Sequence, residues 1–247
     1  MTLLIKGETK VKKSGKKYRA LLDEMGEERN KPLKIDQAVE RIKKFHNRKF
    51  EETVELSIRL GVDLKKLAQP VRNSVVLPHG VGKPVRVLVF AAGEDVARAT
   101  KAGADYVGGQ ELVEKVKGGF LDFDNVVATP DMMKTVSPLG KILGPRGLMP
   151  NPKSGTVTKD IEGIVAELKK GRIDFKMDKD GNLHIPVGKV SFDGVKLAEN
   201  ISAALNAVVA VRPSSVKGNY LRSVSLSLTM SPSVRLDCSE ISQEVTA

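Results

Sequence analysis

A segment rich in proline, glycine and positive charge is the part of this sequence whose chemistry is clearest. Residues 137–157 contain four glycines, four prolines and the cations Lys141, Arg146 and Lys153, with no Asp or Glu. Proline fixes φ and glycine permits positive φ, so the composition predicts a shaped, poorly helical loop. A rigid cationic loop suits a polyanion, most simply a nucleic acid. An ordinary long connection is the alternative on composition alone.

The distribution of charge favours the same type of partner. The net charge is +11 and the pI is about 9.6. Residues 1–49 contain 15 Lys or Arg against seven Asp or Glu, whereas residues 82–170 contain 13 against 11. This predicts a basic amino-terminal arm that follows phosphate, although such arms also serve solubility. Aromatic residues make up 4% and Trp is absent, which favours recognition of a folded RNA by shape and backbone over base stacking.

Signatures of nucleotide-dependent catalysis are absent from the sequence. The segment Phe90-Ala-Ala-Gly-Glu-Asp95 has one glycine followed by two acids where a dinucleotide fingerprint needs a glycine-rich turn. Both Gly80-Val-Gly-Lys-Pro84 and Gly140-Lys-Ile142 depart from the phosphate-loop pattern after the lysine. There is also no G-x-S-x-G nucleophile motif. We therefore predict a protein that is not an enzyme, with a nucleotide-dependent enzyme as the alternative.

Metal, disulfide and membrane signals are also lacking. The three histidines have no metal-motif spacing, and the single Cys238 allows no internal disulfide. No apolar run approaches the roughly 18 residues of a membrane span, and the opening five residues are too short for a signal-peptide core. We expect a cytosolic protein with no cofactor, no metal and no membrane partner.

Periodicity predicts the elements before the turn-rich linker at residues 78–84. A short helix is expected near residues 16–25, and a second over 36–46 with Asp36 as its N-cap. Residues 53–60 alternate strictly, so Val54, Leu56, Ile58 and Leu60 face a core. Another strand is expected at 72–77.

From residue 85 the pattern changes to alternating strands and helices. Strands are expected at 85–90, 105–108 and 125–128, and helices at 94–102, 110–117, 131–136 and 160–170. Such βαβαβ alternation predicts a small parallel sheet with helices on both faces.

Half-buried strands return in the carboxyl-terminal part. Strands at 172–177 and 182–187 flank Asp180-Gly181, a hairpin signal, and a helix follows at 195–211. The last strand, at 220–230, places Thr229 on its polar face and Met230 on its inward face. We expect residues 238–247 to fray.

Antiparallel patterns on both sides of a βαβ block predict an α/β protein with a discontinuous domain and an inserted one. The expected boundaries are 1–80 with 172–247 for the terminal domain and 81–171 for the inserted domain. Two linkers between two lobes suit hinge motion.

Several motifs give the chain a specific resemblance. They include Pro78-His-Gly-Val-Gly-Lys83, Ala102-Gly-Ala-Asp-Tyr-Val-Gly-Gly109, Phe123-Asp-Asn-Val-Val-Ala-Thr-Pro130, Leu139-Gly-Lys-Ile-Leu-Gly-Pro-Arg-Gly-Leu-Met-Pro-Asn-Pro-Lys153, Asn219-Tyr-Leu-Arg-Ser-Val224 and Thr229-Met-Ser-Pro-Ser-Val-Arg235. In this order they resemble the L-one family of bacterial large-subunit ribosomal proteins, from about Lys34 to Arg235.

The resemblance implies both fold and function. It implies a split β-α-β domain formed by both chain ends and an inserted Rossmann-like domain that binds no nucleotide. It implies a stalk protein beside the tRNA exit site that binds a stalk helix of the large-subunit rRNA and contacts deacylated tRNA as it leaves. It also implies repression of translation from the messenger RNA of its own operon. The implied location is the cytoplasmic ribosome, with one copy per ribosome, and a plastid ribosome if the gene is plastid-encoded.

The resemblance also implies which residues bind RNA. The implied rRNA contacts are Lys49, Phe50, Thr53, Glu55, Lys217, Gly218, Arg222, Thr229, Met230 and Ser231. Lys141, Arg146 and Lys153 are the expected auxiliary contacts to rRNA or tRNA, or a clamp between the lobes.

Three of these contacts have alternatives. Glu55 can accept from a 2′-OH or a base amine, or it forms a salt bridge to Arg59. Met230 has core packing as its alternative. Ser231 replaces the usual glycine of the family, and a requirement for positive φ there would weaken RNA binding. A general basic RNA chaperone without site preference is the second alternative function.

Overall fold

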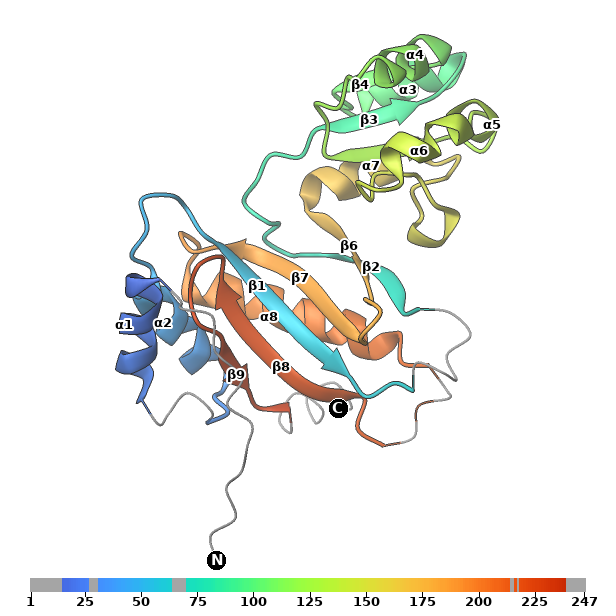
Figure 1. Ribbon diagram of the computed structural model, residues 1–247. Coiled ribbons are helices and arrows are strands. Elements are labelled where there is room, and N and C mark those ends of the chain that lie inside the picture. The colour runs from blue at the N-terminus through green and yellow to red at the C-terminus, as the bar shows by residue number, and fades with distance from the viewer. Residues whose placement is uncertain (1–14, 27–30, 64–69, 214–215, 217, 239–247) are drawn as a thin grey trace, which may run out of the picture.

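The computed structural model has a mixed α/β fold, as predicted. It describes residues 15–26, 31–63, 70–213, 216 and 218–238. Within them lie a four-stranded sheet of order β7-β1-β8-β9, a two-stranded ribbon β2-β6 and a three-stranded sheet β4-β3-β5. The ribbon connects the other two sheets in space (Figure 1).

The four-stranded sheet is antiparallel and is built from both ends of the chain. Its central strands are β1 (Thr53–Leu60) and β8 (Leu221–Leu228), flanked by β7 (Asn182–Lys189) and β9 (Val234–Leu236). Leu56 of β1 lies opposite Ile185 and Leu226. The predicted alternation in β1 is confirmed, because all four of its predicted inward side chains are buried. Strand β9 was not predicted.

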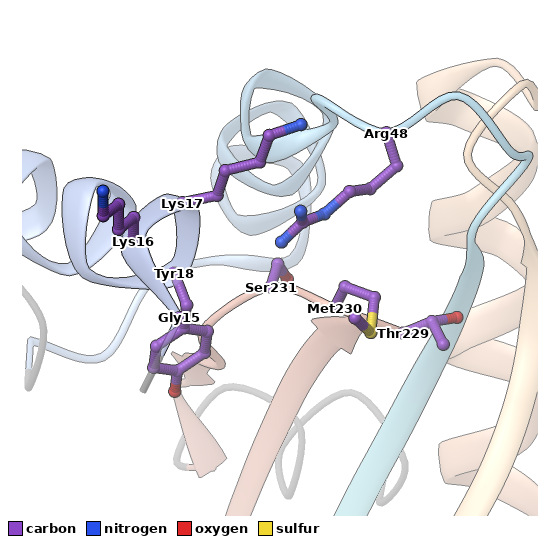
Figure 2. Close-up of a pocket in the computed structure, with 8 residues that line it drawn as sticks. All are labelled: Gly15, Lys16, Lys17, Tyr18, Arg48, Thr229, Met230 and Ser231. Carbon is purple, nitrogen blue, oxygen red and sulfur yellow. The ribbon is translucent and has the colours of Figure 1, made fainter. Parts of the chain in front are cut away.

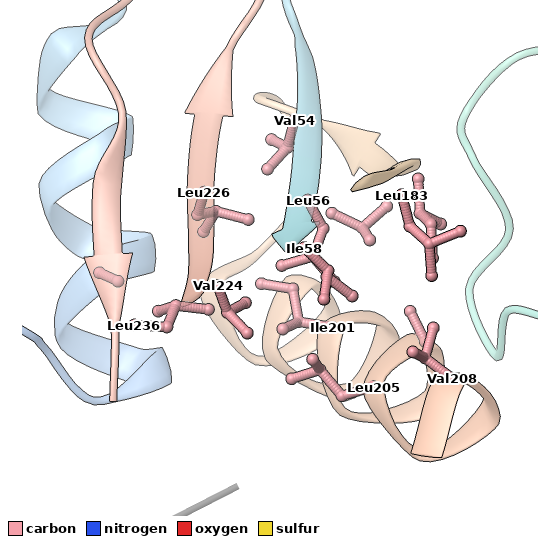
Figure 3. Packing of buried hydrophobic residues seen from close by; sticks show 14 of the residues in the cluster. Val54, Leu56, Ile58, Leu183, Ile201, Leu205, Val208, Val224, Leu226 and Leu236 are labelled. Carbon is pink, nitrogen blue, oxygen red and sulfur yellow. The ribbon is translucent and has the colours of Figure 1, made fainter. Parts of the chain in front are cut away.

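Helices cover the buried face of this sheet. Helix α8 (Gly194–Ala210) packs against β7, and α2 (Ile35–Phe45) packs against α8 and β8. Figure 3 shows Leu56 and Ile58 directed toward Ile201 and Leu205 of α8. Each fully buried side chain of this size stabilises the fold by about 1.5–3 kcal/mol. The opposite face, which no helix crosses in Figure 1, carries exposed Glu55 and Arg59 and a row of serines.

The two amino-terminal helices lie beside each other at the edge of the sheet (Figure 1). The predicted helix α1 (Lys16–Met25) is confirmed and buries Leu21 and Met25. The prediction that Asp36 is the N-cap of α2 is wrong, because the N-cap is Lys34. Backbone bonds between Leu33 and the β9 region hold the chain just before this point, so the helix begins earlier. Asp36 instead lies in the first turn, where a carboxylate complements the helix dipole.

The three-stranded sheet is parallel, as predicted, and β3 is its central strand. Its strands are β3 (Val87–Phe90), β4 (Tyr106–Gly108) and β5 (Asn125–Ala128). Alternate residues of β3 enter two separate clusters: Val87 and Val89 pack with α3 (Glu94–Lys101) and α7 (Ile161–Lys170). Leu88 and Phe90 pack with α4 (Gln110–Lys117) and α5 (Met133–Val136). Helices therefore cover both faces.

The proline- and glycine-rich residues 137–157, called here the cationic segment, differ from the prediction of a poorly helical loop. They contain the 3-10 helix η2 (Ser137–Leu139), the short helix α6 (Gly140–Leu143) and the 3-10 helix η3 (Pro152–Ser154). Leu139 and Leu143 are fully buried with Val136, at helical spacing. Pro138 sits in the first turn, where its missing N–H costs nothing.

The ribbon formed by β2 (Arg72–Val76) and β6 (Arg172–Lys176) corrects the predicted hairpin. The turn is present, because the Asp178 carboxylate accepts from the Asn182 N–H at 2.7 Å and Gly181 has a φ of 84°. However, β6 pairs with β2, whereas β7 pairs with β1. Alternation predicts strands and turns but does not specify which strand edge pairs with which.

The outgoing and returning backbones meet next to this ribbon. Gly80 and Gly171 both have positive φ, and a Cβ on Gly171 would lie 2.4 Å from the Gly80 Cα. Asn200 of α8 is fully buried beside them. Its Nδ2 donates to the Gly80 and Val187 carbonyl oxygens at 3.0 and 2.8 Å, and its Oδ1 accepts from the His79 N–H at 3.1 Å. The crossing is therefore hydrogen-bonded and tightly packed.

Candidate nucleic-acid interface

A buried carboxylate organises the end of the four-stranded sheet where β1 begins. Glu52 is 1% exposed. Its Oε2 lies 2.7 Å from His46 Nδ1, and its Oε1 accepts from the Met230 N–H at 3.0 Å. A carboxylate that receives a backbone N–H makes a charge-assisted hydrogen bond, which is stronger than a neutral one. Glu52 therefore ties the start of β1 to the turn that follows β8.

A second link joins the same two chain segments. The Thr53 N–H donates to Thr229 Oγ1 at 3.2 Å, and Lys189 Nζ donates to Thr53 Oγ1 at 2.9 Å. Thr53 and Thr229 are 176 positions apart in the chain. The structure thus brings together two halves of the implied RNA site that the sequence keeps far apart.

The turn after β8 explains the positions of Met230 and Ser231. The Ser231 N–H donates to the Leu228 carbonyl at 3.3 Å, and Ser231 Oγ accepts from the Leu228 N–H at 2.9 Å. This closes a turn in which Met230 is 50% exposed. The prediction that Met230 faces inward is wrong, because the strand ends at Leu228 and the alternation stops there. Ser231 does not adopt a positive φ, so the serine is unstrained in place of the family glycine.

Lys49 and Phe50 lie just before β1, three and two positions before Glu52. Phe50 is 49% exposed, which is unusual for a large aromatic side chain. Both residues line a hollow of about 520 Å³ that also includes His46 and Ser191. Lys49, Phe50, Thr53, Glu55, Thr229, Met230 and Ser231 are called here the sheet-end surface.

Glu55 is the acidic member of the sheet-end surface. It is exposed on β1 and lies opposite Ser227 of β8. No salt bridge to Arg59 forms, and Glu55 has no ion-pair partner in the described part of the chain. Its oxygens are therefore available to accept from hydroxyl or amine groups.

The other implied rRNA contacts lie elsewhere. Arg222 is near the opposite end of β8, seven residues from Thr229, or about 23 Å at the rise of a strand. Gly218 precedes it, with a φ of 91°. Lys217 lies outside the described residues. The two described positions do not join the sheet-end surface, and the length of the strand between them and Thr229 is the reason.

The cationic segment is exposed at its centre and anchored at its end. Lys141 and Arg146 are exposed, whereas Ser154 is 2% exposed. The Ser154 carbonyl accepts from Arg172 at 2.7 Å, and its Oγ accepts from Arg72 at 3.4 Å. Lys153 belongs to η3, which contacts β2. The segment is thereby attached to the β2–β6 ribbon.

The pKa values of two carboxylates, Asp124 and Asp174, are shifted in opposite directions. The hydrogen bond from Lys83 lowers the pKa of Asp124, whose carboxylate Arg86 also contacts. Burial raises the pKa of Asp174 on β6, against the opposing effect of Ser154 and two arginines. Asp124 and its partners all lie within residues 81–171, whereas Asp174 lies on the β2–β6 ribbon, and neither belongs to the sheet-end surface.

Sequence reasoning missed Glu52, although the signal for it was present. The inward positions of β1 are the even ones from Val54 onward, and Glu52 continues that phase. An acid in phase with a buried face predicts a carboxylate with dedicated partners. Lys189 was also missed, because it joins the site only through the pairing of β7 with β1.

The described residues contain neither a metal-ligand cluster nor a membrane-spanning helix. No group of three or more His, Cys, Asp or Glu side chains is arranged to hold a metal ion there. No helix among those residues is both long and apolar enough to span a membrane.

The fold and the charge together define a basic, mixed α/β protein whose candidate site presents cations, hydroxyl groups and an exposed carboxylate. The model of the ribosomal protein L1p/L10e family matches residues 42–232, and the chain belongs to this family. This membership confirms the prediction of a ribosomal protein that is not an enzyme.

Named relatives agree with the family match. The chain is 53% identical over 239 residues to the large ribosomal subunit protein uL1 of Persephonella marina (strain DSM 14350 / EX-H1), covering 95% of this chain and 98% of that one. It is 52% identical over 217 residues to the protein of the same name from Thermosipho africanus (strain TCF52B), covering 87% and 94%. The protein of that name from Thermosipho melanesiensis (strain DSM 12029 / CIP 104789 / BI429) is 53% identical over 217 residues, again covering 87% and 94%.

Proposed function

We propose that this protein is a structural constituent of the large ribosomal subunit, in the cytoplasm, and that it binds the stalk helix of the large-subunit rRNA as a single copy. Its family membership and the names of its relatives support the place in the large subunit. Its net charge of +11 suits an RNA partner.

The sheet-end surface is the proposed site of rRNA recognition. The observation that carries this proposal is the Glu52 carboxylate, which holds the Thr229–Ser231 turn against the start of β1. A fixed array of hydroxyl groups, one carboxylate acceptor and the exposed Phe50 and Met230 can contact 2′-OH groups, riboses and base edges. Surrounding cations then add affinity by contacting the phosphates of the RNA, whereas the fixed array provides specificity.

We also propose the division into domains given by the sequence. Residues 1–80 and 172–247 form the rRNA-binding domain, and 81–171 form the inserted, Rossmann-like domain. The contact of Gly80 with Gly171 supports this boundary, because the two backbones cross at one point. The separate hydrophobic clusters on either side of the crossing support it further.

A role for the inserted domain completes the proposal. Lys141, Arg146 and Lys153 contact the deacylated tRNA at the exit site and assist its release, in accord with the resemblance to the family. Excess protein binds a stalk-like structure in the messenger RNA of its own operon and represses translation. The tRNA contact is supported by the absence of any acid from the sequence of the cationic segment.

The test is a filter-binding titration against a stalk-helix rRNA fragment and an unrelated duplex of equal length, at several salt concentrations. Wild-type protein is expected to prefer the stalk fragment by orders of magnitude. Thr229→Ala should lower that preference, whereas Lys141→Ala should weaken the binding of both RNAs to a similar extent. Equal binding of the two RNAs by wild-type protein would identify a general RNA chaperone and overturn the proposed site.

The regulatory and tRNA roles need separate measurements. Adding the operon leader RNA should compete with the stalk fragment for one site, and adding the protein to a translation extract should reduce expression from that leader alone. Ribosomes that lack the protein should release exit-site tRNA more slowly, and protein carrying Lys141→Ala with Arg146→Ala should restore the rate only in part. Unchanged expression or unchanged release would remove the respective role.

A further inference from the structure

A pocket of about 510 Å³ opens between helix α1 and the turn after β8, beside the sheet-end surface. It is lined by Gly15, Lys16, Lys17, Tyr18, Arg48, Thr229, Met230 and Ser231. In Figure 2 the Arg48 side chain reaches from the segment after α2 toward Met230 and Ser231, and Tyr18 lies on the α1 side. The pocket thus combines the amino-terminal helix with residues from the far end of the chain.

The cations of this pocket have no acidic partner among the described residues. Within the described residues, neither Lys16, Lys17 nor Arg48 forms an ion pair or a side-chain hydrogen bond. The nearby carboxylate of Glu52 is already engaged by His46 and the Met230 N–H, and that of Glu51 by Ser191. Within the described part of the chain, the positive charge of the pocket is therefore uncompensated, which favours an anionic occupant.

The same pocket also offers apolar and hydroxyl groups. Met230 is half exposed and Tyr18 is half buried, so a thioether and an aromatic ring border the opening. Thr229 and Ser231 add hydroxyl groups. An occupant that matches this lining has a negatively charged group for the cations, a flat apolar face for Tyr18 and Met230, and polar edges for the hydroxyls.

We infer that this pocket receives one unpaired nucleotide of the bound RNA, with its phosphate at Lys17 and Arg48 and its base or ribose between Tyr18 and Met230. A nucleotide carries the anionic, flat and polar groups that the lining requires, and unpaired RNA bases are commonly stacked on aromatic side chains. The volume lies within the range of small-molecule sites. This inference rests on the proposed function and extends it, because it makes α1 part of the RNA site.

The absence of Trp from the chain permits a direct test in the full-length protein. The variant Tyr18→Trp places a single indole at the pocket, and Phe50→Trp places one on the sheet-end surface outside it. Titration with the stalk-helix rRNA fragment is expected to quench the indole emission of the Tyr18→Trp variant, because a base stacks on that ring. The unpaired nucleotides of the fragment are then replaced one at a time by an abasic nucleotide. One of these replacements should remove the quenching in the Tyr18→Trp variant and leave the quenching in the Phe50→Trp variant unchanged.

The two possible failures can be told apart. Quenching in the Phe50→Trp variant with no change in the Tyr18→Trp variant, at full affinity for the stalk fragment, would overturn the nucleotide pocket and leave the proposed function standing. No specific binding of the stalk fragment by wild-type protein would overturn the proposed function itself.

Affinity measurements give an independent readout. Tyr18→Ala is expected to weaken stalk binding about tenfold through lost stacking, and Tyr18→Phe should retain most of the affinity. Combining Lys17→Gln with Arg48→Gln should weaken stalk binding. It should also make the slope of log affinity against log salt less steep by about one to two, as expected for the loss of one or two phosphate contacts. Lys196→Gln, an exposed cation on α8, is the matched control. Equal, small effects of the pocket and control variants would contradict the inference.

Discussion

The sheet-end surface and the cationic segment are the two proposed RNA contacts of this protein, and they are built in opposite ways. In the first, the Thr229–Ser231 turn is fixed by the buried Glu52 carboxylate and by the hydrogen bond from the Thr53 N–H. In the second, Lys141 and Arg146 are exposed, and the anchoring contacts are at Ser154. One region holds its polar groups in place, whereas the other displays charge on long side chains.

This difference indicates a division of labour. Contacts to phosphate position a nucleic acid and add affinity, but they carry little information about its shape or sequence. A rigid array of donors and acceptors can discriminate, because a partner with the wrong geometry leaves those groups unpaired. Mutations in the two regions should therefore differ in how they affect specificity.

Glu52→Ala is expected to have the largest effect. It removes the acceptor of the Met230 N–H and the partner of His46, which lowers the free energy of unfolding by about 1–3 kcal/mol. The turn loses its anchor, so the affinity for the stalk fragment should fall more than about tenfold. Urea unfolding and filter binding measure the two quantities.

Two control variants test whether the effect comes from the acceptor oxygen of Glu52 and not from the loss of an acidic side chain in this region. Glu52→Gln retains an oxygen for the Met230 N–H and should lose less affinity than the alanine variant. Glu51→Gln changes the exposed neighbour and should bind as wild type. Wild-type affinity in Glu52→Ala, despite lower stability, would show that the carboxylate does not organise RNA binding.

Thr229→Val should have the next largest effect. It keeps the shape of the side chain but cannot accept the hydrogen bond from the Thr53 N–H. Losing a bond of about 0.5–1.5 kcal/mol predicts roughly a two- to tenfold weaker affinity for the stalk fragment, with little change for an unrelated duplex. Thr229→Ser should restore binding. A parallel loss on both RNAs would place Thr229 among the nonspecific contacts.

Lys141→Gln combined with Arg146→Gln tests the other side of the comparison. Both cations are exposed, so we expect only a few-fold loss at low salt, shared equally by the stalk fragment and the duplex. The slope of log affinity against log salt should become less steep by about one to two. A loss confined to the stalk fragment would mean that the cationic segment recognises a specific feature.

Asp124→Asn should have the smallest effect and none on RNA binding. Because the pKa of Asp124 is lowered in the folded state, its contribution to stability is present above its ordinary value of 3.8 and is lost as the pH falls through the lowered value. The variant should be less stable by under about 1 kcal/mol at pH 7. Unfolding curves of both proteins should converge at acidic pH. A difference that persists there would contradict the role of the ion pair with Lys83.

Most elements of the fold could be predicted because their periodicity reflects burial. In β1 every second side chain faces the helices, and in α2 the four buried residues have helical spacing. The features that could not be predicted depend on pairing partners. The sequence pattern around Asp180-Gly181 indicates two strands and a turn, but only the tertiary structure shows that β6 pairs with β2.

For the candidate site, the sequence predicted the face that a side chain occupies better than it predicted where the strand ends. Thr229 was expected on a polar face, and its hydroxyl does meet the Thr53 N–H, whereas Met230 is exposed because the Ser231 turn ends the strand. Arg222 was expected near the same strand, but it lies toward the opposite end from Thr229. Composition also overlooked the helical turns of the cationic segment, because the spacing of Val136, Leu139 and Leu143 decides their burial.

The separation of Thr53 from Thr229 has a consequence for synthesis. Thr229 is 176 positions after Thr53 in the chain. At a translation rate of roughly 5–20 residues per second, Thr229 is therefore added roughly 9–35 s after Thr53. Strands β3, β4 and β5 and their helices are complete well before that moment. A prematurely terminated chain therefore carries the exposed cations but not the sheet-end surface. Under the proposed function, only copies that extend past Ser231 carry the rRNA-binding site.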